Sequence, residues 1–297
     1  MTEYESCCLC PRNCKVNRKL KLGYCKADDK LRVARIAPHY WEEPCISGEH
    51  GSGAIFFSYC SLRCVYCQNH EIVSGKGKEI SIEYLAERMI DLQNLKCHNI
   101  NLVTPTHYAP SIIKAISKAK SLGLCIPVVY NCSGYENIQT LKALSGAIDI
   151  YMPDFKYSDD SIAHNYSNAN NYSSIAKLAI DEMISQVGPP VYDDNGMLKK
   201  GVIIRVLALP SNENNTKGVL KIIKKNWNGK VIVSLMSQYT PMRHISEMFP
   251  ELGEKISTEE YEELIGYAKG LRIDNLYTQD GDSAIESFIP NFNLEEV

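Results

Sequence analysis

The chain has 297 residues, enough for one α/β barrel or two smaller domains, and its 44% hydrophobic content is normal for a protein with a sizeable core. A net charge of -3 gives no reason to expect nucleic acid or an anionic membrane as a partner. The N-terminus lacks the basic and then apolar pattern of a signal peptide, and no apolar run approaches the roughly 20 residues of a membrane span. We therefore expect a cytoplasmic protein.

Residues 1–50 are cysteine-rich and irregular, and from residue 51 onward short apolar runs alternate with amphipathic segments. The apolar runs predict strands at 32–36, 54–57, 101–103, 126–130, 148–151, 202–207, 231–235 and 271–275. The amphipathic segments predict a helix that opens after a capping serine at position 81, and further helices at 111–121, 136–144, 175–186, 217–225 and 258–269. The polar stretches 157–172 and 189–200 predict loops.

This alternation indicates a parallel sheet with crossover helices, although periodicity alone fits both an open doubly wound sheet and a barrel. Chemically distinctive residues follow five of the predicted strands. Active sites of (β/α) barrels gather at the C-terminal ends of the strands, which favours the barrel. We predict an α/β barrel-type domain, residues 51–297, preceded by a cysteine-rich metal-binding extension, residues 1–50.

Three cysteines follow the predicted strand 54–57 in the spacing C-x3-C-x2-C, namely Cys60, Cys64 and Cys67. The spacers reach at most about 3.5 Å per residue, so three thiolates can hold one compact cluster. Thiolates are the usual ligands of iron–sulfur clusters, and a [4Fe–4S] cluster ordinarily takes four of them. Three ligands leave one iron open to a substrate, as in catalytic zinc sites. The alternative is a zinc knuckle completed by His70.

With Tyr66 as the aromatic residue before its last cysteine, this motif resembles the signature of the radical S-adenosylmethionine superfamily. The chain is similar in particular to the branch related to pyruvate formate-lyase activating enzymes, and within it to a group that carries cysteines ahead of the motif. The resemblance also includes the segments Trp41-Glu42-Glu43-Pro44, 51–53, 67–69, 104–107, 130–131, 152–156 and 234–239.

The resemblance implies a partial (β/α)6 barrel of the TIM type and an oxidoreductase with two cofactors, a [4Fe–4S] cluster and S-adenosylmethionine. The unique iron would chelate the amino and carboxylate groups of S-adenosylmethionine. An electron from a reduced flavodoxin or ferredoxin-type donor would then break a C–S bond, which gives methionine and a 5′-deoxyadenosyl radical for hydrogen abstraction. The resemblance leaves the substrate open between a glycyl-radical protein partner, a peptide and a small molecule.

The resemblance also assigns residues around the cofactor. Asp154 and Lys156 would approach the carboxylate of S-adenosylmethionine, and Asn131 and Ser133 would approach its ribose. The complete set of predicted cofactor-binding residues is Tyr66, Thr104, Thr106, Asn131, Ser133, Asp154, Lys156, Arg205 and Gln238. Without the resemblance, these residues fit ordinary ion pairs and turns at strand ends equally well.

One departure from the activating enzymes concerns the end of the second barrel strand. At this position the activating enzymes carry Gly-Gly-Glu, and the glutamate carboxylate receives the methionine amino group. Here the strand ends in Val103-Thr104-Pro105-Thr106-His107, which offers no carboxylate. The hydroxyls or backbone carbonyls of Thr104 and Thr106 would have to substitute.

The extension carries four further cysteines, Cys7, Cys10, Cys14 and Cys25, in the spacing C-x2-C-x3-C-x10-C. Four thiolates can close a zinc site or a second [4Fe–4S] cluster. A small irregular segment often gains its fold from a metal, because ligation offsets chain entropy that a small core cannot. Free thiols, or a different fourth ligand such as Cys45 or His50, are the alternatives.

Two other classes of protein compete with the enzyme. A non-catalytic iron–sulfur protein for electron transfer would supply a fourth protein ligand to the cluster of Cys60, Cys64 and Cys67. A zinc-binding interaction protein would hold zinc in place of a cluster.

Overall fold

Ten strands form one sheet in the parts of the chain that this computed structural model describes, residues 4–279, 292–294 and 297. The strands are β1 (Arg32–His39), β2 (Ser52–Phe57), β3 (Lys78–Glu79), β4 (Ile100–Val103), β5 (Val128–Cys132), β6 (Ile150–Pro153), β7 (Val191–Tyr192), β8 (Leu198–Leu207), β9 (Ile232–Met236) and β10 (Leu276–Thr278). Their order is β10-β9-β8-β6-β5-β4-β2-β1-β3, and β7 also pairs with β8.

The strands from β2 through β4, β5, β6, β8 and β9 to β10 pair in parallel, whereas β1 and β3 are antiparallel additions beside β2. The ends of this sheet, β10 and β3, do not pair with each other among the described residues, so the barrel is open. This arrangement confirms the predicted α/β fold with a partial TIM-type barrel.

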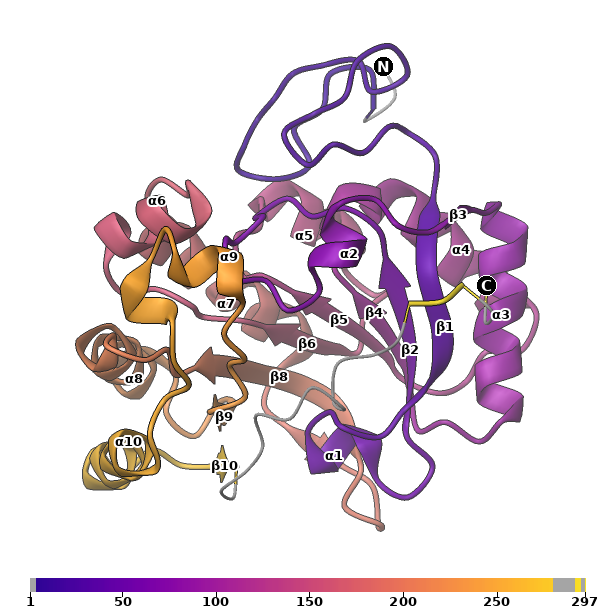
Figure 1. Cartoon of the computed structure of the whole chain (residues 1–297). Coiled ribbons are helices and arrows are strands. Elements are labelled where there is room, and N and C mark those ends of the chain that lie inside the picture. The colour runs from indigo at the N-terminus through magenta and orange to yellow at the C-terminus, as the bar shows by residue number, and fades with distance from the viewer. Residues whose placement is uncertain (1–3, 280–291, 295–296) are drawn as a thin grey trace.

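Helices connect the parallel strands, and Figure 1 shows α3, α4, α8 and α10 on the outside of the curved sheet. The helices are α1 (Pro44–Ser47), α2 (His70–Val73), α3 (Ile82–Asn94), α4 (Ala109–Ser121), α5 (Ile138–Leu144), α6 (Asp160–Ser167), α7 (Tyr172–Val187), α8 (Glu213–Trp227), α9 (Arg243–Ser246) and α10 (Thr258–Gly270). The side chain of Ser81 accepts from the Tyr84 amide at 3.0 Å, which confirms the predicted N-terminal cap of α3. None of the described helices has the length and apolar character needed to cross a membrane.

Three predictions of local structure were wrong. The predicted loop 189–200 contains β7 and the first residues of β8, which pair antiparallel. The predicted strand 271–275 is a turn in which Arg272 and Asn275 have φ angles of 53° and 52°, and β10 follows it. Apolar side chains of this turn pack against the core, which explains the strand-like pattern. The predicted loop 157–172 contains α6, because Asp159 caps the Ser161 amide and the buried side chains of Ala163 and Tyr166 anchor a helix rich in polar residues.

The interior of the barrel is closed at the N-terminal ends of the strands by residues 40–47, here called the barrel plug. The plug joins β1 to β2 and includes α1, which lies at the opposite end of the sheet from the extension in Figure 1. Its Cys45 and Ile46 are buried against the first residues of several strands, including Ile150 and Ile232. Asn99 fixes the plug by donating to the Ile46 carbonyl at 2.7 Å.

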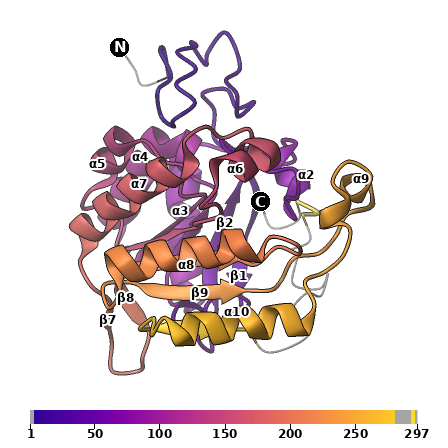
Figure 2. The same cartoon turned by 90° about the vertical axis from the view of Figure 1, so that its left-hand side faces the viewer.

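The part of the predicted extension that precedes β1, residues 4–31 and called the extension from here on, lies across the other end of the barrel, above α4, α5 and α6 in Figure 2. Thr140 of α5 donates to the Leu9 carbonyl at 2.7 Å, and the hydroxyls of Tyr4 and Ser111 are 3.0 Å apart. Arg18 is only 1% exposed and donates to the carbonyls of His107 and Asp28. The division of the chain at residue 50 stays a prediction; β1 lies before it and pairs with β2.

The barrel plug should carry much of the stability of the domain. Replacing Ile46, which is fully buried, by alanine leaves a cavity between the strands and should lower the free energy of unfolding by about 2 to 5 kcal/mol. Leu178 on α7 is 60% exposed, and its replacement by alanine should change stability by less than about 0.5 kcal/mol. Urea denaturation of both variants measures the difference, and equal costs would contradict the role of the plug.

Candidate active site

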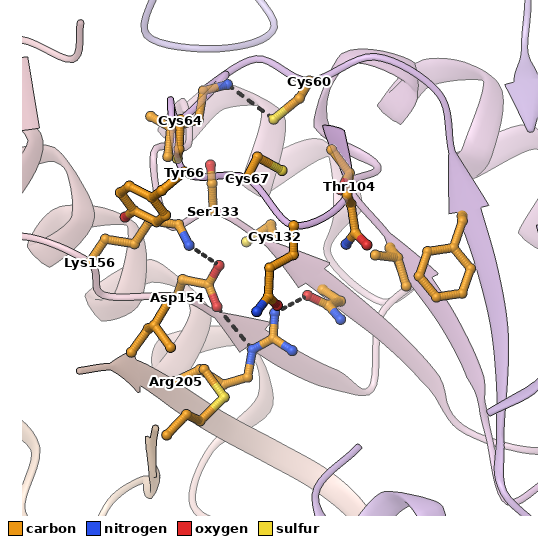
Figure 3. A pocket seen from close by; sticks show the side chains of 18 of the residues that line it. Cys60, Cys64, Tyr66, Cys67, Thr104, Cys132, Ser133, Asp154, Lys156 and Arg205 are labelled. Carbon is orange, nitrogen blue, oxygen red and sulfur yellow. Dashed lines mark hydrogen bonds and ion pairs between the residues drawn. The ribbon is translucent and has the colours of Figure 1, made fainter. Parts of the chain in front are cut away.

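The three cysteines of the C-x3-C-x2-C motif lie on a loop between β2 and α2, residues 58–69, here called the cysteine loop. Tyr59 and Arg63 adopt φ angles of 71° and 58°, which turn the loop back on itself. The side chain of Leu62 is fully buried beneath it. As a result, all three cysteines line one pocket, and Figure 3 shows them at one end of it.

The thiols of the cysteine loop are partly buried and influence one another. Loss of solvation is the main reason why the pKa of Cys60 rises to about 11, and the neighbouring Cys64 contributes further to the rise. Loss of solvation also raises the pKa of Cys67, and Cys64 and Cys60 raise it further. These two thiols are therefore neutral at pH 7 in the metal-free chain and would lose their protons on binding a metal.

Within the described ranges, no group of three or more cysteine, histidine, aspartate or glutamate side chains is placed so that it could hold a metal ion. The case for the cysteines as cluster ligands therefore rests on their spacing, their shared pocket and their mutual effect on pKa.

Beside the cysteines the pocket carries an ion-pair network from three neighbouring strands, and its Lys156 lies near enough to lower the pKa of Cys60 and Cys67 (Figure 3). Asp154, which follows β6, lies 2.8 Å from Lys156 Nζ and 2.9 Å from Arg205 Nε. Arg205 of β8 also donates to Asn131 of β5 at 2.7 Å. Loss of solvation alone would raise the pKa of Asp154, but the two cations outweigh it and lower that pKa. The carboxylate of Asp154 is thus charged at neutral pH and organises both cations.

A carboxylate that sequence analysis did not select completes this network. Glu42 of the barrel plug accepts from Asn101 at 2.9 Å and from Arg205 at 3.3 Å, and it lines the pocket. Its burial raises its pKa, and the charge of Arg205 opposes that rise. The sequence signal is the Trp41-Glu42-Glu43-Pro44 segment, which lies between the two cysteine regions and belongs to the resemblance.

The other predicted cofactor-binding residues also line the pocket, and they differ in whether their polar groups already have hydrogen-bond partners. The hydroxyl of Thr106 already donates to Glu136 at 2.8 Å, whereas Thr104 sits at a φ of 60°, unusual for a β-branched residue. The buried hydroxyl oxygen of Ser133 has no hydrogen-bond partner among the described residues. Tyr66 is buried and bonds the Tyr157 hydroxyl at 2.7 Å.

Gln238 lines the pocket from the segment after β9, and its backbone carbonyl accepts from the side chain of Gln68 on the cysteine loop. Gly134 follows Ser133 at a φ of 73°, and a Cβ atom there would lie 2.2 Å from the Asp154 carbonyl oxygen. Only glycine permits this close approach between the ends of β5 and β6. The pocket wall is therefore assembled from closely packed strand ends.

The cysteines of the extension lie apart from this pocket, since none of them lines it. They are neighbours of one another: loss of solvation raises the pKa of Cys25, and Cys7 and Cys14 raise it further. A Cβ atom at Gly23 would lie 3.6 Å from Cys14 Sγ and 3.7 Å from Cys25 Sγ, so the backbone at Gly23 passes close to two of the sulfurs.

Residues 54–187 match the family model of the Radical SAM superfamily. The match begins in β2, ends with α7 and includes the cysteine loop and the Asp154–Lys156 pair. An uncharacterized protein of Methanocaldococcus jannaschii is 29% identical to the chain over 286 residues, which cover 92% of this chain and 77% of that protein.

Solved structures share the fold. The chain aligns with SuiB of Streptococcus suis bound to S-adenosylmethionine at a TM-score of 0.52 and 11% identity, over 75% of this chain and 49% of SuiB. It aligns with methylornithine synthase at a TM-score of 0.54 and 16% identity, over 76% of this chain and 63% of that enzyme. This chain thus spans about half the length of SuiB. At these identities the similarity shows the fold alone.

Glu136 is a buried acid that the predicted helix 136–144 included but that lies before the observed helix. The helix begins at Ile138, after the cap residue Asn137, and Glu136 points inward with 1% exposure. It accepts from Thr106 and from Tyr130, at 2.8 and 3.3 Å. Burial raises its pKa to about 8, so a protonated carboxyl supports the pocket wall at neutral pH.

Glu136 should make stability depend on pH. Its pKa in the folded state, about 8, lies above its ordinary value of 4.5, so between these values the folded state holds a proton that the unfolded state has lost. Stability therefore falls as pH rises through this window, by about 1.4 kcal/mol per pH unit. Glu136→Gln removes the effect, so its free energy of unfolding relative to the wild type should increase from pH 5 to pH 8. A difference independent of pH in urea denaturation would contradict this.

Proposed function

We propose that this chain is a radical S-adenosylmethionine enzyme whose [4Fe–4S] cluster is held by Cys60, Cys64 and Cys67. When both cofactors are bound, they supply one chemistry: an electron enters the sulfonium, a C–S bond breaks to give methionine and a 5′-deoxyadenosyl radical, and the radical takes a hydrogen atom from the substrate. The observation that carries the proposal is the placement on one pocket of three cysteines from one short loop, in the part of the chain that matches the Radical SAM family model.

The residues present fit these cofactors. The thiols at one end of the pocket are neutral and poorly solvated, so ligation to iron would replace a costly isolated thiolate by a metal bond. Three cysteines leave one iron without a protein ligand, and His70, the fourth ligand of the alternative zinc knuckle, is exposed and does not line the pocket. An open position of this kind suits a bound ligand.

The ion-pair network would hold the methionine part of S-adenosylmethionine. Lys156 is kept charged by Asp154, which raises the pKa of Lys156 against the opposing effect of burial. A cation in this position can donate to a carboxylate by a charge-assisted hydrogen bond. Asp154 and Glu42 are the carboxylates nearest to the same end of the pocket, and they would accept from an ammonium group where the activating enzymes use Gly-Gly-Glu.

The ribose would lie between Asn131 and Ser133. The Ser133 hydroxyl oxygen is buried without a partner, and a diol in the pocket would satisfy it. Asn131 presents its carboxamide to the same cavity while bonding Arg205. Tyr66 and Gln238 close the pocket around the adenosyl group.

The narrower predictions stay predictions. These are the relationship to pyruvate formate-lyase activating enzymes, a flavodoxin or ferredoxin-type electron donor, and a glycyl-radical protein, a peptide or a small molecule as substrate. SuiB, which shares this fold, was solved with a precursor peptide bound. Deuterium transfer from a labelled glycyl-radical protein into 5′-deoxyadenosine would identify a protein substrate directly.

We also propose a second metal at the extension, held by Cys7, Cys10, Cys14 and Cys25. Cys7, Cys10 and Cys25 are buried, and Cys25 and Cys7 raise the pKa of Cys10 beyond the rise that burial causes. Four thiols in a short segment without a helix or strand before β1 supply the number of ligands that zinc or a second [4Fe–4S] cluster requires.

The cluster assignment predicts the effect of removing one cysteine. Anaerobically reconstituted wild type, incubated with dithionite and S-adenosylmethionine, should form 5′-deoxyadenosine, and Cys64→Ala should lower its rate at least about 100-fold. Cys125→Ala removes an exposed thiol outside the pocket and should retain the activity. No product from the wild type, or equal rates for the two variants, would rule out the proposed function.

The proposed metal of the extension predicts different effects of replacing Cys10 and Cys8, two cysteines separated by one residue. Cys10→Ser should lose the zinc, or the iron and sulfide, that the wild type binds beyond the cluster of the cysteine loop. Cys8→Ser changes an exposed thiol and should retain it. Elemental analysis and the visible spectrum after anaerobic purification distinguish the two metals, and identical metal content in both variants would refute the site.

A further inference from the structure

Arg12 connects the extension to the cysteine loop. It lies between Cys10 and Cys14 in sequence, yet its guanidinium reaches the barrel. Its Nε donates to the Ser61 carbonyl at 3.1 Å, and its Nη2 donates to the Leu62 carbonyl at 3.1 Å. Both carbonyls belong to residues between Cys60 and Cys64, so one side chain from the extension fixes the spacer between two of the cysteines.

The contact with Ser61 acts on a peptide group that faces a cysteine sulfur. The Ser61 carbonyl and the Leu62 amide belong to the same peptide plane. The Leu62 amide donates to Cys60 Sγ at 3.3 Å. A cation bound to the Ser61 carbonyl oxygen fixes the orientation of this peptide plane. It also polarises the peptide, so that the N–H group becomes a stronger donor to the sulfur. Arg12 thereby strengthens a hydrogen bond to Cys60 without touching the sulfur.

Arg12 is itself held rigidly. Its guanidinium carbon lies 3.9 Å from the ring centroid of Tyr24 and 5.2 Å from that of Tyr135. It also donates to the carbonyls of Ser167, at 2.8 Å, and Asn168, which end α6. A positive side chain is favourable at the C-terminal end of a helix. The planar fork of arginine thus bridges the extension, α6 and the cysteine loop, which lysine cannot reproduce.

The end of α6 is itself attached to the cysteine loop, because the Val65 amide donates to the Tyr166 carbonyl at 2.8 Å. The spacers before and after Cys64 are therefore both held, one by Arg12 and one by α6. A change in the extension near Cys10 and Cys14 would act directly on the first of these contacts.

We infer that Arg12 is a positioning residue that raises the reduction potential of the cluster held by the cysteine loop; this inference rests on the proposed function. Hydrogen bonds to the sulfurs and nearby charge set the potentials of iron–sulfur clusters. Arg12 supplies both, through the Leu62 amide and through its own charge, and each stabilises the more negative, reduced cluster. The extension therefore adjusts how readily the cluster accepts its electron.

The test compares full-length wild type with Arg12→Gln, Arg12→Lys and Lys21→Gln, all reconstituted anaerobically. Lys21 is an exposed residue of the extension, so its variant removes the same charge without touching the cysteine loop. The midpoint potential is measured by redox titration of the electron paramagnetic resonance signal that changes when S-adenosylmethionine is added. This criterion separates the cluster of the cysteine loop from any second cluster in the extension.

Arg12→Gln should lower the equilibrium constant for reduction of the cluster about threefold. The midpoint potential should then be about 28 mV lower, because a tenfold change in this constant corresponds to 59 mV for a one-electron couple. Arg12→Lys keeps the positive charge but loses the planar guanidinium, so the midpoint potential should also be lower than in the wild type, by less than in Arg12→Gln. Lys21→Gln should titrate as the wild type. If Arg12→Gln binds no cluster, Arg12→Lys provides the comparison.

An Arg12→Gln or Arg12→Lys cluster that titrates at the wild-type potential would overturn the inference, and so would an equal shift in Lys21→Gln. If the wild type binds a cluster at the cysteine loop, the proposed function stands even when one of these outcomes overturns the inference. A wild type that binds no cluster at the cysteine loop would overturn both.

Discussion

The site depends on three thiols that one short loop brings to a poorly solvated pocket. An isolated thiolate is costly there, which is why the pKa values of Cys60 and Cys67 rise, and a metal ligand removes that cost. The loop has no regular structure of its own and is held by its surroundings. The Tyr59 amide donates to the Ile72 carbonyl of α2, α6 holds Val65, and Arg12 holds the spacer after Cys60. Local spacing sets which sulfurs come together, and these long-range contacts set their orientation.

The ion-pair network beside the cysteines follows a second constraint, that buried charges must be paired. Asp154 and Lys156 follow β6, Arg205 belongs to β8 and Glu42 to the barrel plug, and each has an opposite charge within 3.3 Å. Because separating Lys156 from Asp154, or Glu42 from Arg205, would leave a buried charge without an opposite charge, the network fixes the distance between these elements. Sulfurs and paired charges of both signs in one pocket suit a zwitterionic nucleotide ligand.

Sequence reasoning predicted the parallel strands well because they follow from local pattern, and the residues that the resemblance assigned to the cofactor all line the pocket. Apolar runs mark strands that are buried on both faces, and the residues directly after such strands meet at one edge of the barrel. It failed where burial depends on tertiary partners. Glu136 and Arg12 are charged residues that nothing in their immediate sequence distinguishes from surface residues, and the resemblance that includes Glu42 assigns it no role. Only the folded chain brings Glu42 to Arg205, Glu136 to Thr106 and Arg12 to the Ser61 carbonyl. The helix α6 was missed for the same reason, since two buried side chains anchor an otherwise polar segment.

A crystal structure of the anaerobically reconstituted full-length chain with S-adenosylmethionine tests the central interpretation most directly. We expect the sulfurs of Cys60, Cys64 and Cys67 on three irons of one [4Fe–4S] cluster, and the amino and carboxylate groups of S-adenosylmethionine on the fourth. A protein side chain on the fourth iron, or a cluster bound away from the cysteine loop, would contradict it.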